Sequence, residues 1–194
     1  MSQQQVLDEF RACGALLEGH FILTSGLHSG TYLQCARVVM EADRADKLCA
    51  ELRRRVQETI TDRIDLVVSP AMGGVVVGYE MGRQLSVPAI FFERVDGKLV
   101  LRRGFEIPQG TNCLMVEDIV TTGLSSRECI QGIRDAGGNV VGAACLIDRS
   151  GGQADVGVPL VSLAGLNIAT YEADALPAEL AALEAVKPGS RGMQ

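Results

Sequence analysis

The chain of 194 residues is 47% hydrophobic and 22% charged, a composition typical of a globular protein that forms one domain with a sizeable core. A net charge of −6 and the absence of tryptophan argue against a general nucleic-acid binder, which needs a basic surface or aromatic platforms for stacking. The polar start lacks signal-peptide features and no apolar run could span a bilayer, so we expect a cytoplasmic protein with no membrane partner.

The first half of the chain predicts helices alternating with extended segments. Apolar residues at helical spacing predict helices at 4–17 and 41–61. Between them, a cluster of Ser, Thr and Gly residues predicts a turn flanked by short extended pieces at 21–34. The next three predicted elements are a strand, a helix and a strand, at 65–69, 74–85 and 88–92.

The second half begins with a different pattern at 93–104, where two polar–apolar alternations surround Asp96-Gly97 and predict a β-hairpin. This segment carries four cations: Arg94, Lys98, Arg102 and Arg103. The elements predicted after the hairpin are strands at 112–116, 139–147 and 159–164, helices at 125–136 and 176–186, and a flexible tail at 188–194.

Strands and helices alternate from residue 65 to residue 147, which predicts an α/β fold with a parallel sheet and right-handed crossovers. Ligand sites in such sheets lie beyond the carboxyl ends of the strands. Six cysteines occur without any C-x-x-C pair, and the chain has two histidines. We therefore expect buried reduced thiols and no metal site built by the protein.

The segment 114–126 (LMVEDIVTTGLSS) carries the clearest chemical signal. An apolar strand leads to Glu117 and Asp118, and a turn rich in Thr, Gly and Ser then opens a helix. Hydroxyls, a glycine and a helix N-terminus suit a phosphate monoester, and carboxylates beside a phosphate make sense as acceptors for sugar hydroxyls. The alternative is a strand end with surface acids before a Ser/Thr-capped helix.

This segment resembles the phosphoribosyl diphosphate (PRPP) signature of the type I phosphoribosyltransferases. The resemblance implies a single domain over 1–194, with a parallel sheet flanked by helices and a small base-side hood to which residues 1–40 contribute. It implies that Mg²⁺ arrives bound mainly through PRPP. The PRPP-binding residues that it implies are Glu117, Asp118, Ile119, Val120, Thr121, Thr122, Gly123, Leu124 and Ser125.

Four further segments resemble the orotate phosphoribosyltransferases: 21–32, 69–74, 92–105 and 146–151. The resemblance implies that Arg149 and Thr121 bind orotate, since a guanidinium can hold a carboxylate in bidentate fashion. It implies a homodimer in which the 93–104 hairpin reaches the neighbouring site. Arg94 and Lys98 would stabilise the leaving pyrophosphate, and Asp118 would complete the catalytic set.

Some positions depart from the better-known bacterial pattern. Thr24 stands where a lysine is often found, and Met72-Gly73 replaces a Tyr-Lys pair. Alternatives therefore stay open: a phosphoribosyltransferase for a purine base, or a non-catalytic regulator that senses PRPP. Separate alternatives also remain for single features: Arg149 could form a surface ion pair with Asp148, and the hairpin cations could protect a sheet edge.

Overall fold

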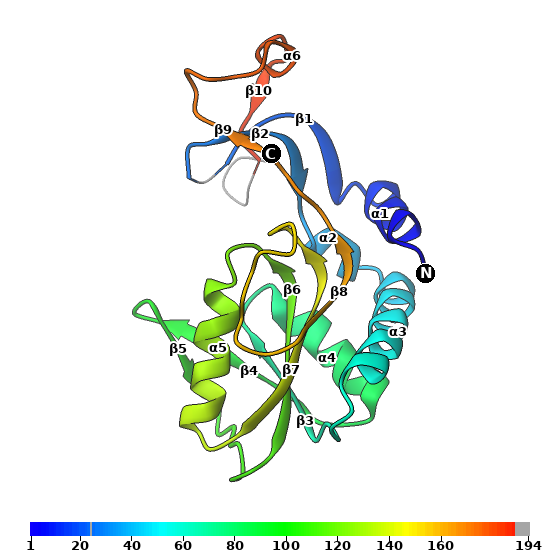
Figure 1. The fold of residues 1–194 in the computed structure, drawn as a ribbon, viewed down its shortest axis with the longest axis vertical. Helices are drawn as coiled ribbons and strands as arrows, with labels where there is room; N and C mark the ends of the chain where they lie inside the picture. Colours follow the sequence, from blue (N-terminus) through cyan, green and yellow to red (C-terminus); the bar gives the residue numbers. More distant parts are fainter. Residues whose placement is uncertain (24, 189–194) are drawn as a thin grey trace.

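A computed structural model describes residues 1–23 and 25–188 of the chain. The predicted tail at 188–194 lies outside these residues except for Pro188, and so does Thr24. The chain forms a six-stranded central sheet flanked by helices, and a smaller four-stranded sheet above it, which we call the hood (Figure 1). No helix in the described ranges is long and apolar enough to cross a membrane.

The central sheet has the strand order β5-β4-β3-β6-β7-β8. All pairs are parallel except β4–β5, which is the antiparallel hairpin at one edge. The predicted parallel α/β sheet is thus confirmed. Its strands are β3 (Leu66–Pro70), β4 (Ala89–Val95), β5 (Lys98–Leu101), β6 (Asn112–Val120), β7 (Asn139–Asp148) and β8 (Leu160–Gly165).

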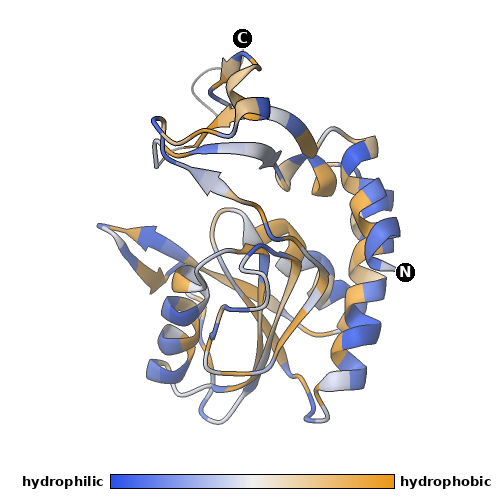
Figure 2. Ribbon diagram, turned by 45° about the horizontal axis from the view of Figure 1, so that its top comes forward, coloured by the Kyte–Doolittle hydropathy of each residue, from blue (hydrophilic) through white to orange (hydrophobic). Residues whose placement is uncertain are grey.

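Helices cover both faces of this sheet. On one face lie α3 (Ala42–Thr59) and α4 (Gly74–Leu85), whose buried residues share a core cluster with Leu114, Val116 and Leu146. On the other face α5 (Leu124–Asp135) forms a second cluster with Cys113 and Met115. Figure 2 shows the result, with hydrophobic strands inside and hydrophilic outer faces on the helices.

Helix α4 packs very closely on the strands because it carries glycine at the points of contact. A Cβ atom at Gly78 would lie 1.9 Å from the Ser69 hydroxyl oxygen, and one at Gly82 would lie 2.8 Å from the Ala89 side chain. The close approach holds the loop between β3 and α4 against the end of β6, where the predicted site lies.

The hood combines strands from both ends of the chain, in the order β10-β1-β2-β9. Its strands are β1 (Leu16–Ile22), β2 (His28–Leu33), β9 (Thr170–Tyr171) and β10 (Ala185–Val186). Three short helices adjoin these strands in the chain: α1 (Gln3–Ala12) before β1, α2 (Ala36–Val39) after β2, and α6 (Ala178–Ala181) between β9 and β10. In Figure 1 the hood lies above the edge at which β6 and β7 end, so it covers the expected side of the site.

Two predicted helices are wrong in extent. The helix predicted over 4–17 ends at Ala12, because Gly14 turns the backbone to a φ of 65° and β1 begins at Leu16. The helix predicted over 176–186 survives only as the four residues of α6, and β10 then pairs with β1 in parallel register. Strand pairing overrides the local helical pattern in both places, with the neighbouring strand β2 at Leu16 and Leu17 and with the distant strand β1 at β10.

The predicted hairpin is confirmed. Residues 92–95 of β4 pair with residues 98–101 of β5, and the strands join through Asp96 and Gly97, both of which have positive φ. Two positive φ values define the turn whose twist matches a two-stranded ribbon, and an Asp-Gly pair adopts it readily. The hairpin projects from the sheet edge beside α5 (Figure 1).

Candidate active site

Strand β6 separates the two carboxylates of the predicted site. The strand was predicted to end at Val116 but continues to Val120, so Glu117 and Asp118 are strand residues whose side chains alternate between the faces. Glu117 continues the row of Met115, which packs toward α5, and Asp118 continues the row of Val116, which packs toward α3 and α4. The acidic pair therefore meets two different parts of the chain.

Glu117 lies beside the first turn of α5. The hydroxyl group of Ser126 donates a hydrogen bond to its Oε2 atom. Burial raises the pKa of the Glu117 carboxyl to about 7, the Ser126 hydroxyl opposes this shift, and the neighbouring Asp118 charge adds to it. The charge of the Glu117 carboxylate near neutral pH therefore depends on the groups around it.

Asp118 lies against the loop between β3 and α4. A Cβ atom at Gly73 would be 2.6 Å from the Asp118 Oδ1 atom, so the backbone passes the carboxylate at a distance that only glycine permits. Burial raises the pKa of Asp118, while backbone amide hydrogen bonds lower it. The sequence interpretation counted Gly73 as a departure from a family pattern, whereas the structure shows that it makes room for Asp118.

The turn between β6 and α5 forms a pocket of about 180 Å³. Gly123 has a φ of 73° and begins the helix, and the Leu124 amide donates to the Thr122 hydroxyl over 3.4 Å. Seven of the nine predicted PRPP-binding residues line this pocket: Glu117, Ile119, Thr121, Thr122, Gly123, Leu124 and Ser125. The other two do not, because Asp118 faces the opposite side and Val120 is 1% exposed.

Sequence reasoning missed Arg127, which fastens the turn from outside. Its guanidinium donates to the carbonyl oxygens of Thr122 at 3.0 Å and of Asp155 at 2.9 Å. The turn is therefore tied to the segment between β7 and β8. The only sequence signal for this role is an arginine in the first turn of the predicted helix. Its second partner, Asp155, is distant in sequence and could not be predicted.

Arg149 follows directly after β7, next to the turn. Its backbone amide donates to the Val120 carbonyl over 2.7 Å, and its guanidinium is half-buried, with a pKa lowered by burial. Within the described ranges its side chain has no hydrogen-bond or ion-pair partner. The Asp148 carboxylate instead accepts hydrogen bonds from the Ser150 amide and hydroxyl, so the alternative ion pair with Arg149 does not form.

The structure does not bring Arg94 and Lys98 to the pocket. Arg94 forms an ion pair with Glu128 on α5 and donates to the Gly97 carbonyl within its own hairpin. Lys98 is exposed at the start of β5. Both cations thus lie on the projecting hairpin, outside the set of residues that line the turn.

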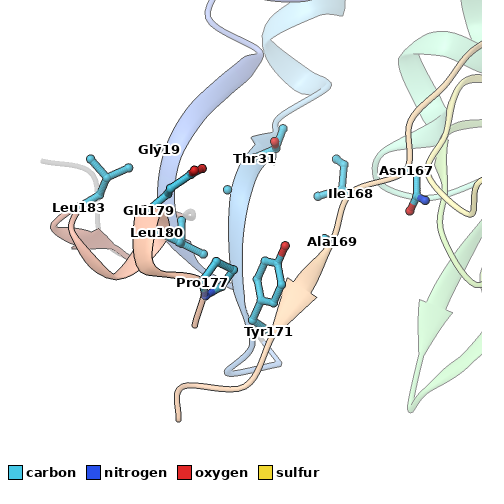
Figure 3. Close-up of a pocket in the computed structure, with 11 residues that line it drawn as sticks. Gly19, Thr31, Asn167, Ile168, Ala169, Tyr171, Pro177, Glu179, Leu180 and Leu183 are labelled. Carbon is cyan, nitrogen blue, oxygen red and sulfur yellow. The ribbon is translucent and has the colours of Figure 1, made fainter. Parts of the chain in front are cut away.

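A second cavity of about 370 Å³ lies in the hood (Figure 3). Gly19 and Thr31 come from its two long strands, Tyr171 from β9, and Glu179 and Leu180 from α6. It is larger than the pocket at the turn but contains neither Arg149 nor any residue of the 117–125 segment. The predicted chemistry therefore belongs to the smaller pocket.

Glu117 and Asp118 are oxygen ligands of the kind that Mg²⁺ accepts, but they do not form a cage for it. The described residues contain no group of three or more His, Cys, Asp or Glu side chains placed to hold a metal ion. The donor set fits a cation that brings most of its own oxygen ligands.

Comparisons with known proteins agree with this geometry. Residues 40–164 match the family model described as "Phosphoribosyl transferase domain". The chain is 56% identical to the orotate phosphoribosyltransferase of Caulobacter vibrioides and 57% identical to that of Sphingopyxis alaskensis, covering the whole of this chain and 100% and 99% of theirs. The crystal structure of orotate phosphoribosyltransferase from Aeropyrum pernix superimposes with a TM-score of 0.66 at 27% identity, covering 82% of this chain and 93% of the other.

Proposed function

The chain belongs to the phosphoribosyltransferase family, and we infer from its full-length similarity to orotate phosphoribosyltransferases that it transfers the 5-phosphoribosyl group from PRPP to orotate. The products are orotidine 5′-monophosphate and pyrophosphate, and the reaction belongs to pyrimidine biosynthesis. The observation that carries this function is the half-buried Arg149, which has no side-chain partner among the described residues and lies beside the pocket of the 121–125 turn, because orotate supplies a carboxylate that its guanidinium can bind.

The reaction is a substitution at the anomeric carbon of the ribose. The bond from this carbon to a pyrophosphate oxygen breaks, a bond to a pyrimidine nitrogen forms, and positive charge develops on the sugar. The proton that this ring nitrogen carries leaves to the departing pyrophosphate or to water as the new bond forms, and the ionised orotate carboxylate is not itself the attacking group. Positioning and electrostatics carry most of the catalysis.

We propose that the two carboxylates hold the ribose from both sides of β6. Glu117 lies beside the phosphate turn and Asp118 beside the Gly73 loop, so a sugar at the end of the strand can engage both. Each carboxylate accepts hydrogen bonds from ribose hydroxyls and favours the positive charge of the transition state. The turn from Thr121 to Ser125 binds the 5′-phosphate through its amides, its hydroxyls and the N-terminus of α5.

Arg149 and Thr121 form the orotate end of the site in this proposal. The register of β6 and β7 pairs Val120 with Asp148, which brings the next residues of the two strands together. The Mg²⁺ ion that the family implies would be held mainly by diphosphate oxygens and water, and it would supply positive charge beside the leaving group.

Arg94 and Lys98 act on the leaving pyrophosphate of a neighbouring subunit in the proposed homodimer. Two features support a second copy. The hairpin projects from the edge of the central sheet (Figure 1). The loop before α4 and the first turns of α4 also present an exposed apolar stripe, in which Met72, Val76 and Tyr79 are 83%, 47% and 69% exposed. A cytoplasmic location stays a prediction from the sequence.

Subunit mixing tests the shared site. Lys98→Ala and Asp118→Asn each inactivate the homodimer if both residues are essential. A mixture of the two variants recovers about a quarter of the wild-type activity when the hairpin acts across the interface, because one site in each mixed dimer is intact. No recovery in a mixture that forms dimers contradicts the proposal.

The acceptor is tested with purified chain, Mg-PRPP and either orotate, adenine or guanine. Orotate-dependent release of pyrophosphate supports the function stated here. Turnover with a purine and none with orotate would make the chain a purine phosphoribosyltransferase. The absence of any turnover, together with a DNA mobility shift at low salt, would favour a PRPP-sensing regulator.

A further inference from the structure

Ser126 has an unusual partner for a serine within a helix. It is the third residue of α5 and is 0% exposed. A serine at such a position commonly donates to the carbonyl four residues earlier, but this hydroxyl donates across to Glu117 on β6. The hydrogen bond therefore joins the helix to the strand at the carboxylate, rather than satisfying the helix alone.

The surroundings of Glu117 make this donor important. Its titratable neighbours are Asp118 on the same strand, Cys145 opposite on β7 and Cys129 on α5, and none of them is a cation. Strand β3 carries no titratable residue.

The charged residues of α4 are occupied elsewhere, since Glu80 and Arg83 pair with each other and Arg83 also pairs with Asp46. In the described part of the chain, the Ser126 hydroxyl is the hydrogen-bond donor that reaches the Glu117 carboxylate. A buried carboxylate with one donor depends strongly on that donor for its ionised form.

We propose that Ser126 is a positioning residue for the transfer reaction: its hydroxyl fixes Glu117 through Oε2, so that Oε1 is free to accept hydrogen bonds from the ribose of PRPP. The inference rests on the proposed function, because it assigns Glu117 to the ribose. Ser126 itself is buried and is not among the residues that line the pocket, so we expect it to act through Glu117 rather than by contact with the substrate.

The direction of the expected effect follows from the charge state. Burial already raises the pKa of Glu117 to about 7, and the Ser126 hydroxyl holds it below the value that burial alone would give. Removing the hydroxyl raises this pKa further, so a larger fraction of Glu117 is protonated at neutral pH. The acid limb of the pH profile then moves to higher pH, and alkaline pH restores the ionised form.

The test measures kcat/KM for PRPP from about pH 5.5 to 9.5 in the full-length enzyme. Ser126→Ala and Ser126→Cys, which keeps the volume but donates weakly, shift the acid limb upward by about one pH unit. Below the limb this lowers kcat/KM about tenfold, mainly through KM for PRPP, with recovery above it. Ser126→Thr keeps the hydroxyl and restores the profile. The matched control is Cys129→Ala. Cys129 is as buried as Ser126, lies one turn later on α5 and forms no hydrogen bond with Glu117, so this variant leaves the acid limb of the pH profile in place.

A Glu117→Gln background separates positioning from packing. PRPP binding measured by calorimetry is unaffected by Ser126→Ala in that background if Ser126 acts through the carboxylate. An equal loss at every pH, or an equal loss in both backgrounds, assigns Ser126 to packing and overturns the proposal. If wild-type protein does not convert orotate, the proposed function fails instead, so the two failures are distinguishable.

Discussion

Replacing Gly73 by alanine tests the contact that holds Asp118. The new Cβ atom would lie 2.6 Å from Oδ1 and 2.8 Å from Oδ2, whereas ordinary contact begins at 3.4 Å, so the carboxylate must retreat by about 0.8 Å. A displacement of about 1 Å at a reacting centre can cost about 100-fold in rate. We therefore expect kcat/KM for orotate to fall about 10- to 100-fold, or about 1.4 to 2.7 kcal/mol in the transition state.

Stability should change little, because Gly73 has a φ of −55°, which alanine adopts without strain. Steady-state assays at saturating Mg-PRPP measure the rate, and thermal denaturation checks the fold. Asp118→Ala is the matched background, since it removes the clashing carboxylate. PRPP binding measured by calorimetry is compared in the two backgrounds. If Gly73→Ala weakens it by the same factor in both, or costs no activity in the wild type, the contact with Asp118 is not what limits catalysis.

Three further changes test other contacts. Arg149→Ala should raise KM for orotate about 10- to 100-fold with less effect on KM for PRPP; equal effects on both would place Arg149 outside the orotate site. Glu128→Gln removes the ion-pair partner of Arg94, so limited proteolysis should cut the hairpin faster than in wild type. An unchanged cutting rate would show that the ion pair does not restrain the hairpin. Gly123→Ala places a side chain on a residue with a φ of 73° and puts its Cβ atom 3.0 Å from the Arg127 guanidinium. Denaturant unfolding should therefore show a loss of about 1 to 2 kcal/mol in the free energy of unfolding, and activity assays should show a higher KM for PRPP. A variant equal to wild type in both measurements refutes the role of the turn.

The central sheet could be predicted from the sequence because its signals are local. Helix α4 spans residues 74–85 as predicted, because its apolar residues are regularly spaced and the strands before and after it are separated from it by clear breaks in the pattern. The hairpin followed from Asp96-Gly97, because few residue pairs accept positive φ at both positions. The pocket at the turn followed from Thr121 to Ser125, because these five lining residues are contiguous in sequence.

The features that could not be predicted depend on contacts between distant segments. Strand β10 pairs with β1 across most of the chain length, and neither segment signals its partner. The separation of Glu117 from Asp118 depends on where β6 ends, which pairing with β7 decides. The close approach of Gly73 to Asp118 and the bond from Ser126 to Glu117 likewise join elements whose spacing the fold alone determines.

The central claim is that one strand end holds the ribose between two carboxylates, with the phosphate turn on one side and Arg149 at the base. A crystal structure of the protein with orotate and a non-reactive PRPP analogue measures this directly. We predict ribose hydroxyls on Glu117 and Asp118, the 5′-phosphate in the 121–125 turn, and the orotate carboxylate paired with the Arg149 guanidinium. A ribose that contacts neither carboxylate, or an orotate carboxylate bound away from Arg149, would contradict it.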